Sequence, residues 1–261
     1  MARLGIGLVG LVLFLALAGP WLAPHDPLAT AVVRALQPPS AAHWFGTDHL
    51  GRDVLSRVLH AARLDLAIAV SAAALAAVAG SLAGAAAGWA GGWVDAGMSR
   101  VVDVLLALPL FLLAMLLVLA VGNSVATVVA VTTLVNLPFF IRLVRVEVAR
   151  GLAAPWVEGL RIAGAGEARI LLRFVLPQVA PLIAVQASVT LGWGILNAAG
   201  LSFLGIGVRP PTAEWGIMLA EGARYLNSGQ WWMAAFPAAV LVAAVLGFQL
   251  TGDALRDRAA R

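Results

Sequence analysis

The sequence predicts an all-α membrane protein with about six transmembrane helices. Of its 261 residues, 62% are hydrophobic and 11% are charged, whereas soluble domains carry about 25% charged residues. Four long runs contain no charge at all, at residues 66–94, 104–141, 174–208 and 225–252. Each run is long enough for at least one crossing, because a helix needs roughly 20 apolar residues to span a bilayer.

The first apolar stretch, residues 4–23 behind Arg3, predicts the first span. A cleaved signal peptide is the alternative, because Ala16-Leu17-Ala18 resembles a cleavage site. The stretch continues past that point and several further spans follow, which favours a retained helix.

Residues 24–65 form an outer segment that is rich in proline at first and then turns helical. Thr47 or Asp48 can cap this helix, and Asp53 and Arg57 can pair on its polar side at i,i+4 spacing. Its apolar residues recur at helical spacing at Leu50, Val54, Leu55, Val58 and Leu59. We expect an amphipathic helix that lies along the outer membrane surface and leads into the second span.

The second, third and fourth spans are predicted at residues 66–90, 101–121 and 125–145. The run 104–141 is long enough for most of two helices, and Gly122-Asn123-Ser124 is a natural turn between them. In the second span, the small residues Gly80, Gly84 and Gly88 stand four apart, which lets helices approach closely. That close packing could serve a subunit interface or only the interior of the chain.

The fifth and sixth spans are predicted at residues 178–205 and 231–251. Between them lies a second outer segment, residues 206–230. Trp215, Trp231 and Trp232, in and beside this segment, suit the aromatic belt at the membrane interface.

The distribution of arginine predicts that both termini are cytoplasmic. With the N-terminus inside, eleven arginines lie on the cytoplasmic side: Arg3, Arg100, Arg142, Arg145, Arg150, Arg161, Arg169, Arg173, Arg256, Arg258 and Arg261. Six lie outside: Arg34, Arg52, Arg57, Arg63, Arg209 and Arg224.

Composition also excludes several chemistries. All 17 basic residues are arginine, so the chain cannot supply the lysine of a nucleotide-binding P-loop. It has no cysteine, and no pair of its four histidines (His25, His43, His49 and His60) has the i,i+4 spacing of a helical metal site. We therefore expect surface histidines rather than a metal site, no catalytic residue and no cofactor. Because the arginines mostly flank apolar segments, the sequence pI near 11.1 indicates no nucleic-acid partner.

A polar side chain inside a span costs free energy unless it has a partner or faces water. The candidates for a translocation path are Asp103, Asn136, Gln186, Ser188, Thr190 and Asn197. Hydrogen bonds between helices are the alternative explanation. Paired intramembrane carboxylates and a proton-relay series are both lacking, so nothing indicates ion coupling.

A charged interruption between the fourth and fifth spans resembles the cytoplasmic coupling motif of ABC-importer permeases. Glu158, Gly164 and Leu176-Pro177 stand at the spacing of that motif, although Gly159 and Leu160 replace its two alanines and Phe174 its isoleucine. The resemblance implies that Glu158, Gly159 and Arg161 lie on a short helix that docks on an ATPase. Gly164 would turn the chain sharply at its end, and Pro177 would mark the return into the fifth span.

Further stretches resemble the dipeptide/oligopeptide/nickel branch of ABC importers, and in particular the second of its two permeases. They are His43-Trp44-Phe45-Gly46-Thr47-Asp48, Gly51 to Arg57, Gly91-Gly92-Trp93-Val94-Asp95, Leu201 to Gly205 with Pro210-Pro211, Glu214-Trp215-Gly216, and Gly252 to Asp257. The resemblance covers nearly the whole chain in the same order.

The resemblance implies a type I importer permease in the inner membrane of a prokaryote. Its partners would be a second homologous permease, two cytoplasmic ATP-binding subunits and an extracytoplasmic substrate-binding protein, within membrane lipid. The chain would divide into an N-terminal helix with its outer segment (1–63), a transmembrane domain (64–253) and a cytoplasmic tail (254–261). The solute would be a di- or oligopeptide or a related small molecule.

Two other functions are weighed against this one. An ion-driven secondary transporter would need inverted repeats and functional intramembrane acids. A non-transporting membrane scaffold would leave the pattern from Glu158 to Pro177 without a purpose.

Overall fold

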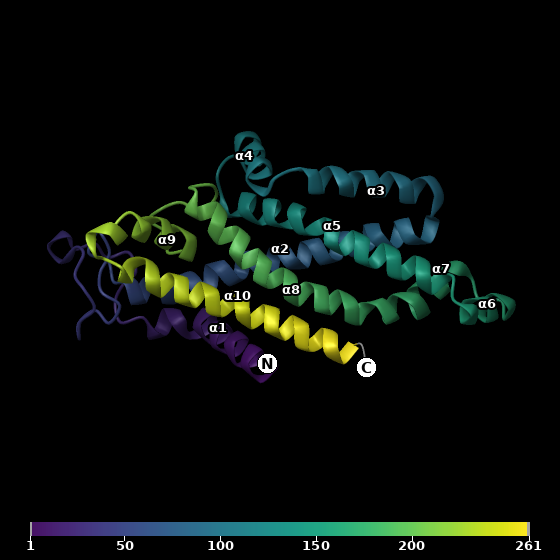
Figure 1. The fold of residues 1–261 in the computed structure, drawn as a ribbon, viewed down its shortest axis with the longest axis horizontal. Coiled ribbons are helices and arrows are strands. Elements are labelled where there is room, and N and C mark those ends of the chain that lie inside the picture. Colours follow the sequence, from purple (N-terminus) through teal and green to yellow (C-terminus); the bar gives the residue numbers. More distant parts are fainter. Residues whose placement is uncertain (1, 260–261) are drawn as a thin grey trace.

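The computed structural model describes residues 2–259 and contains an elongated bundle of helices (Figure 1). By length and apolar character, five helices can each cross a membrane, and a bent pair can form a sixth span. The predicted fold class of about six spans is thus confirmed. The long helices are α1 (Ala2–Leu22), α2 (Val54–Ala90), α5 (Val125–Leu152), α8 (Leu176–Phe203) and α10 (Trp232–Ala259). Arg261, one of the eleven arginines predicted to be cytoplasmic, lies outside the described residues.

The third span differs from the prediction of one helix over residues 101–121. It consists of α3 (Gly92–Ala107) and α4 (Leu110–Val121), which meet at an angle of 94°. Leu108 between them has an extended backbone, with ψ at 122°. The cause is Pro109, because a proline disfavours the helical conformation for the residue before it. The turn after α4 is as predicted: Gly122 has a φ of +87°, and the Ser124 side chain accepts a hydrogen bond from the Thr127 N–H to cap α5.

The glycines of α2 serve internal packing rather than a subunit interface. A Cβ on Gly80 would lie 2.6 Å from Phe140 Cβ, one on Gly84 would lie 2.6 Å from the Ile141 carbonyl oxygen, and one on Gly88 would lie 2.5 Å from the Arg145 carbonyl oxygen. All three neighbours belong to α5. Only a hydrogen atom fits at these positions, so α2 and α5 approach backbone to backbone.

The expected surface helix is absent from the described outer segment. Instead α2 begins at Val54 and continues without a break to Ala90. Its first turns are buried, because Val54 and Val58 join the core beside α1, α9 (Trp215–Ala223) and α10, and Leu59 is buried as well. The cap is also different from the expectation of Thr47 or Asp48. The Asp53 carboxylate accepts the Ser56 N–H at 2.8 Å and therefore caps α2.

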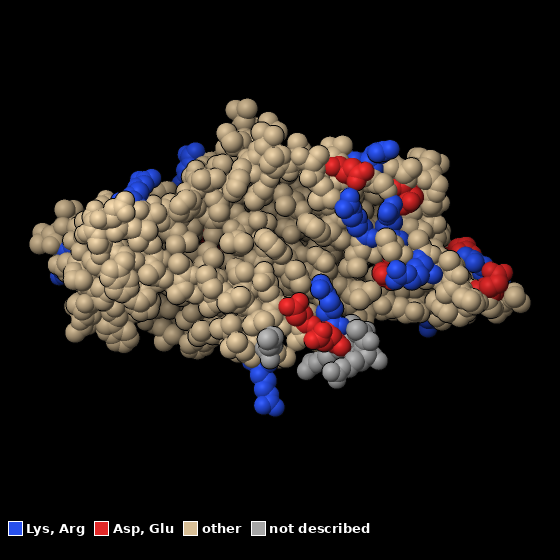
Figure 2. Space-filling view, viewed as in Figure 1, with Lys and Arg blue, Asp and Glu red and all other residues tan. Residues whose placement is uncertain are grey.

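The two ends of the bundle differ in character. The α9 end carries the outer segment of residues 24–53, with η1 (Val32–Arg34), and η3 (Leu226–Ser228). The α6 end carries α6 (Pro155–Ile162), α7 (Glu167–Ile170) and a π-helical turn, η2 (Leu171–Val175). On the face shown in Figure 2, charged side chains gather toward the α6 end, and residues without charge cover most of the middle.

Candidate functional sites

A cavity of about 360 Å³ lies between α4, α5 and α8. It brings together four of the six residues that the sequence singled out for a translocation path: Asn136, Gln186, Thr190 and Asn197. Its remaining lining is apolar, with Trp193 and Phe139 as the largest side chains. Three of the four polar residues come from α8, at positions four and then seven apart, so one stripe of that helix faces the cavity.

Part of this polar set also forms hydrogen bonds inside the chain. The Asn136 amide donates to the Thr132 carbonyl at 2.7 Å within α5. The Gln186 amide lies 3.4 Å from the Thr190 hydroxyl within α8. These bonds satisfy the groups within their own helices, so they do not tie one helix to another.

The other two candidates lie elsewhere. The Ser188 hydroxyl is buried and donates to the Phe248 carbonyl of α10 at 3.0 Å. Ser188 therefore forms a hydrogen bond between two helices, which was the alternative to a place in the translocation path. Asp103 is half exposed on α3 and accepts from Arg142 of α5 at 3.0 Å. This pair links α3 to α5, and neither residue lines the cavity of Asn136.

The α6 segment has the geometry expected of a projecting helix. Pro155 starts α6, and the helix ends at Ile162. Gly164 follows with a φ of +82°, and the Ala165 N–H bonds back to the Leu160 carbonyl. Residues with a Cβ rarely adopt that φ, so Gly164 permits the sharp turn that the sequence predicted.

One buried side chain anchors α6 to the bundle, while its outer face stays free. Val157 is fully buried with residues of α5, α7 and α8. By contrast Ile162 is 82% exposed and Trp156 is 40% exposed, and the Glu158 side chain also faces solvent. Exposed apolar residues beside a charged one are typical of a surface that a protein partner covers.

Arg161 connects the two sides of the turn. Its Nε donates to Glu167 Oε1 at 2.7 Å and its Nη1 donates to Glu158 Oε2 at 3.3 Å. The hydrogen bond from Arg161 lowers the pKa of the Glu167 carboxyl. Glu167 was not predicted as a site residue, because its role depends on the fold of the turn between it and Arg161.

The return into the fifth span occurs earlier than predicted. The helical path begins at Glu167 rather than near residue 178, and continues through η2 into α8. Leu176 and Pro177 therefore lie inside this path and do not start it. The wide turn of η2, in which the Leu176 N–H bonds to the Leu171 carbonyl, precedes Pro177 directly.

At the α9 end, a buried ion network replaces the predicted pair of Asp53 and Arg57. Arg52 donates to Asp48 at 2.6 Å and to Glu221 of α9 at 3.1 Å. Arg57 lies 3.6 Å from Asp48 and 3.7 Å from Glu221. The network connects the outer segment, α2 and α9. A contact such as Arg52–Glu221, across 169 positions, gives no local signal in the sequence.

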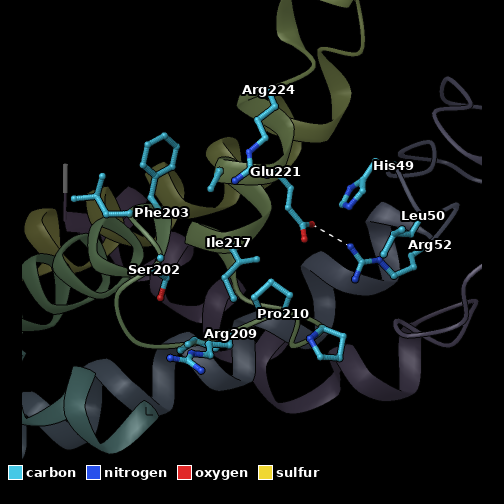
Figure 3. Close-up of a pocket in the computed structure, with 15 residues that line it drawn as sticks. His49, Leu50, Arg52, Ser202, Phe203, Arg209, Pro210, Ile217, Glu221 and Arg224 are labelled. Atoms are coloured by element: carbon cyan, nitrogen blue, oxygen red, sulfur yellow. Dashed lines mark hydrogen bonds and ion pairs between the residues drawn. The ribbon is translucent and has the colours of Figure 1, made fainter. Parts of the chain in front are cut away.

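This network borders an open pocket of about 460 Å³ (Figure 3). Arg209 and Arg224 lie on opposite sides of it in this view, and Glu221 lies between them and Arg52. Its walls come from α9, from residues 202–211 and from residues 49–52. The pocket therefore offers both signs of charge at the surface of the α9 end.

Two tryptophans that were expected at the membrane interface are instead buried structural residues. Trp215 is fully buried and its indole N–H donates to the Val58 carbonyl at 3.2 Å. The Trp232 indole donates to the Thr47 carbonyl at 3.1 Å. Trp231 alone of the three is exposed. Each buried indole connects elements that are far apart in the chain.

One histidine also departs from the expectation of surface histidines. His43 is buried, and its Nδ1 lies 2.8 Å from Asp53 Oδ1. His25 is exposed, and its ring lies 4.7 Å from that of His43. The sequence does not indicate this group, because Asp53 lies ten positions after His43 in an irregular part of the chain.

Comparison with known proteins adds the following findings. Residues 76–261 match the family model described as binding-protein-dependent transport system inner membrane component. Residues 1–39 match a model of the N-terminal transmembrane domain of oligopeptide transport permease C.

Three relatives are similar over almost the full chain. The dipeptide transport system permease protein DppC of Escherichia coli (strain K12) is 45% identical, over 98% of this chain and 87% of the relative. The di/tripeptide transport system permease protein DppC of Pseudomonas aeruginosa is 41% identical, over 95% and 83%. The probable D,D-dipeptide transport system permease protein DdpC of Escherichia coli is 39% identical, over 96% and 84%.

Proposed function

The chain belongs to the family of binding-protein-dependent transport system inner membrane components, a family of multi-pass ABC-transporter permease subunits, and from that premise we propose that its solute is a di- or oligopeptide. The observation that carries this proposal is the 45% identity to a dipeptide permease across 98% of the chain. The other two relatives described above also bear the names of peptide permeases.

The cavity between α4, α5 and α8 is proposed as this subunit's part of the translocation path. Its support is chemical: amide and hydroxyl groups of Asn136, Gln186, Thr190 and Asn197 sit in an otherwise apolar wall. Such groups can hydrogen-bond the backbone of a passing peptide without fixing its side chains. A second homologous permease would close the open side of the path.

The α6 end is proposed as the cytoplasmic side and α6 as the coupling helix. Exposed Glu158, Trp156 and Ile162 would enter a groove of an ATP-binding subunit, and two such subunits would supply the hydrolysis. The chain is a translocation subunit and not an ATPase. At the opposite end, the pocket of Arg209, Glu221 and Arg224 is proposed as the docking surface of the substrate-binding protein.

The test is transport by the reconstituted complex. The chain, its partner permease, the ATP-binding subunits and the binding protein are placed in liposomes, and uptake of a labelled dipeptide is measured with and without ATP. We expect ATP-dependent uptake that unlabelled di- and oligopeptides inhibit. Competition by a nickel chelate or a glycoside alone, with no effect of peptides, would contradict the proposed substrate class and leave the family unaffected.

A further inference from the structure

The outer segment carries a group of three potential metal ligands that is separate from the cavity, the α6 segment and the pocket of Figure 3. The ligand atoms of His25, His43 and Asp53 all lie within 4.8 Å of one another. We propose that these three residues bind a divalent transition-metal ion, with zinc as the best fit to two imidazoles and one carboxylate.

The geometry is close to that of a zinc site. Three ligands at zinc-bond lengths stand roughly 3.4 Å apart in a tetrahedral arrangement. In the structure, Asp53 Oδ1 lies 2.8 Å from His43 Nδ1 and 3.7 Å from His25 Nδ1. Lengthening the His43 contact by roughly 0.6 Å and shortening the His25 contact by roughly 0.3 Å would bring both imidazoles to that separation from the carboxylate.

Asp53 is prepared for this role by its surroundings. Its Oδ2 accepts the Ser56 N–H at 2.8 Å and the Ser56 hydroxyl at 2.7 Å, which fixes the carboxylate and leaves Oδ1 toward the two histidines. Hydrogen bonds of this kind orient metal-binding carboxylates. No arginine in the part of the chain that the structure describes forms an ion pair with Asp53, so a metal ion would supply the positive charge.

The burial of the three residues fits a site with one open position. The side chains of Asp53 and His43 are 1% and 6% exposed, whereas that of His25 is 38% exposed. An ion could therefore enter from the His25 side and retain a water molecule there. The chain at His25 is held close, because the backbone N–H of His25 donates to the Ser56 hydroxyl at 3.1 Å.

Asp48, His49 and Glu221 form a second group whose potential ligand atoms lie within 4.8 Å of one another. This group differs from the first in its ion pairs. Both of its carboxylates already pair with Arg52 and lie within 4 Å of Arg57. Two guanidinium groups therefore occupy the place of a cation. Because arginines neutralise Asp48 and Glu221 but not Asp53, we assign the metal site to His25, His43 and Asp53. His49, in the group that arginines neutralise, is a suitable control.

Bound metal would join the outer segment to the start of α2. His25 and His43 belong to the irregular chain that precedes α2, and Asp53 is the residue that caps it. A metal bond across these parts would stabilise the outer segment, because binding energy at such a site adds to folding energy.

The experiment uses the assembled complex, stripped with a chelator and then supplied with zinc chloride alone. Bound zinc is measured by elemental analysis, and the unfolding temperature by a thermal scan. We expect His25→Ala to lose one zinc ion per copy of this chain and to lose the zinc-dependent rise in unfolding temperature. His49→Ala should behave as the wild type. Equal zinc content in the wild type and His25→Ala, or an equal loss in His49→Ala, would overturn the proposal.

Direct evidence of ligation comes from a third variant. This chain contains no cysteine, so His25→Cys introduces a single thiol at the site. After replacement of zinc by cobalt(II), a thiolate-to-cobalt charge-transfer band should be present in His25→Cys and absent from the wild type. A His25→Cys complex that folds and takes up cobalt elsewhere, without this band, would contradict the site. The readout is independent of transport.

Discussion

Arg161 near the end of α6 and Glu167 at the start of α7 form a two-fold hydrogen-bonded ion pair across the turn at Gly164. Its two contacts measure 2.7 and 3.2 Å. Both side chains are substantially exposed, and exposed pairs contribute little to stability. The pair instead sets the direction of α6 relative to α7, and through η2 relative to the span that contains the cavity.

The first prediction concerns transmission through α6. Glu158→Lys should reverse a charge on the docking surface, at a cost of about 2–5 kcal/mol if the ATP-binding subunit buries a pair there. Gly164→Val should obstruct the turn, because a β-branched residue is strained at a φ of +82°. In proteoliposomes, both should abolish peptide uptake and the stimulation of ATP hydrolysis by loaded binding protein.

The control is Asp253→Lys, a charge reversal at an exposed position of α10. It should leave peptide uptake close to that of the wild type. Both α6 variants should still fold, since Val157 anchors α6 in the core and is unchanged. Near-normal uptake by Glu158→Lys and Gly164→Val would contradict the coupling role and show that α6 is only a solvent-exposed connection between α5 and α7.

A second prediction fixes the orientation of the bundle. Reporter fusions after Gln37, Gly166 and Arg261 should report outside, inside and inside, because arginine is more abundant at the α6 end. An inside signal at Gln37 would reverse the assignment of both ends. A mature chain that lacks its first residues would show instead that α1 is cleaved as a signal.

Third, the packing of α2 on α5 should not tolerate a larger residue at Gly84. A Cβ there would lie 2.6 Å from a backbone oxygen, which cannot move independently of its helix. Gly84→Leu should destabilise the protein by about 1–3 kcal/mol or more, as overpacking generally does. Gly7→Ala is the control, because nothing lies near its added Cβ. Equal unfolding temperatures for the two variants would disprove the close approach.

The sequence predicts those parts of this molecule that depend on local composition. Charge-free runs locate the spans, and Gly164 and Gly122 mark turns because a positive φ favours glycine. The bend at Pro109 also has a local signal, because a proline disfavours a helical conformation at the residue before it; the turn at Gly122 does not reveal this second break in the run 104–141. In contrast, the buried positions of Arg52 and His43 depend on partners distant in the chain or across irregular segments, and no periodicity reports such contacts.

The cavity leads to a fourth prediction. Gln186→Trp should fill part of the space between α4, α5 and α8 and reduce peptide uptake by about tenfold, a change of roughly 1.4 kcal/mol. ATP hydrolysis should continue, because α6 is unaffected. Ala184→Trp is the control, since Ala184 is exposed on the same helix and does not line the cavity. Equal uptake by the two variants would remove Gln186 from the path.

The last prediction concerns two acids that meet at the start of α9. Glu214 caps α9 by accepting the Ile217 N–H at 2.7 Å, and Asp65 of α2 accepts the Trp215 N–H at 3.0 Å. Both carboxyl groups are buried, and Asp65 Oδ1 and Glu214 Oε1 have no hydrogen-bond partner among the described residues.

Burial is the main reason why the pKa of the Glu214 carboxyl is raised above its ordinary value of 4.5. The folded protein therefore holds the Glu214 proton more tightly than the unfolded chain does. It follows that the stabilising effect is complete below the unfolded pKa and is lost as the pH rises through the folded pKa. The unfolding temperature should accordingly fall as the pH is raised from about 4.5 toward 8.

Asp65→Asn should flatten this dependence, because an asparagine can accept the Trp215 N–H and also donate to an ionised Glu214 carboxylate. The variant should be more stable than the wild type at the upper end of the pH range, where the paired acids are least favourable. If thermal scans of the complex give the same slope for Asp65→Asn and the wild type, the titration of these two buried acids does not control the stability of the protein.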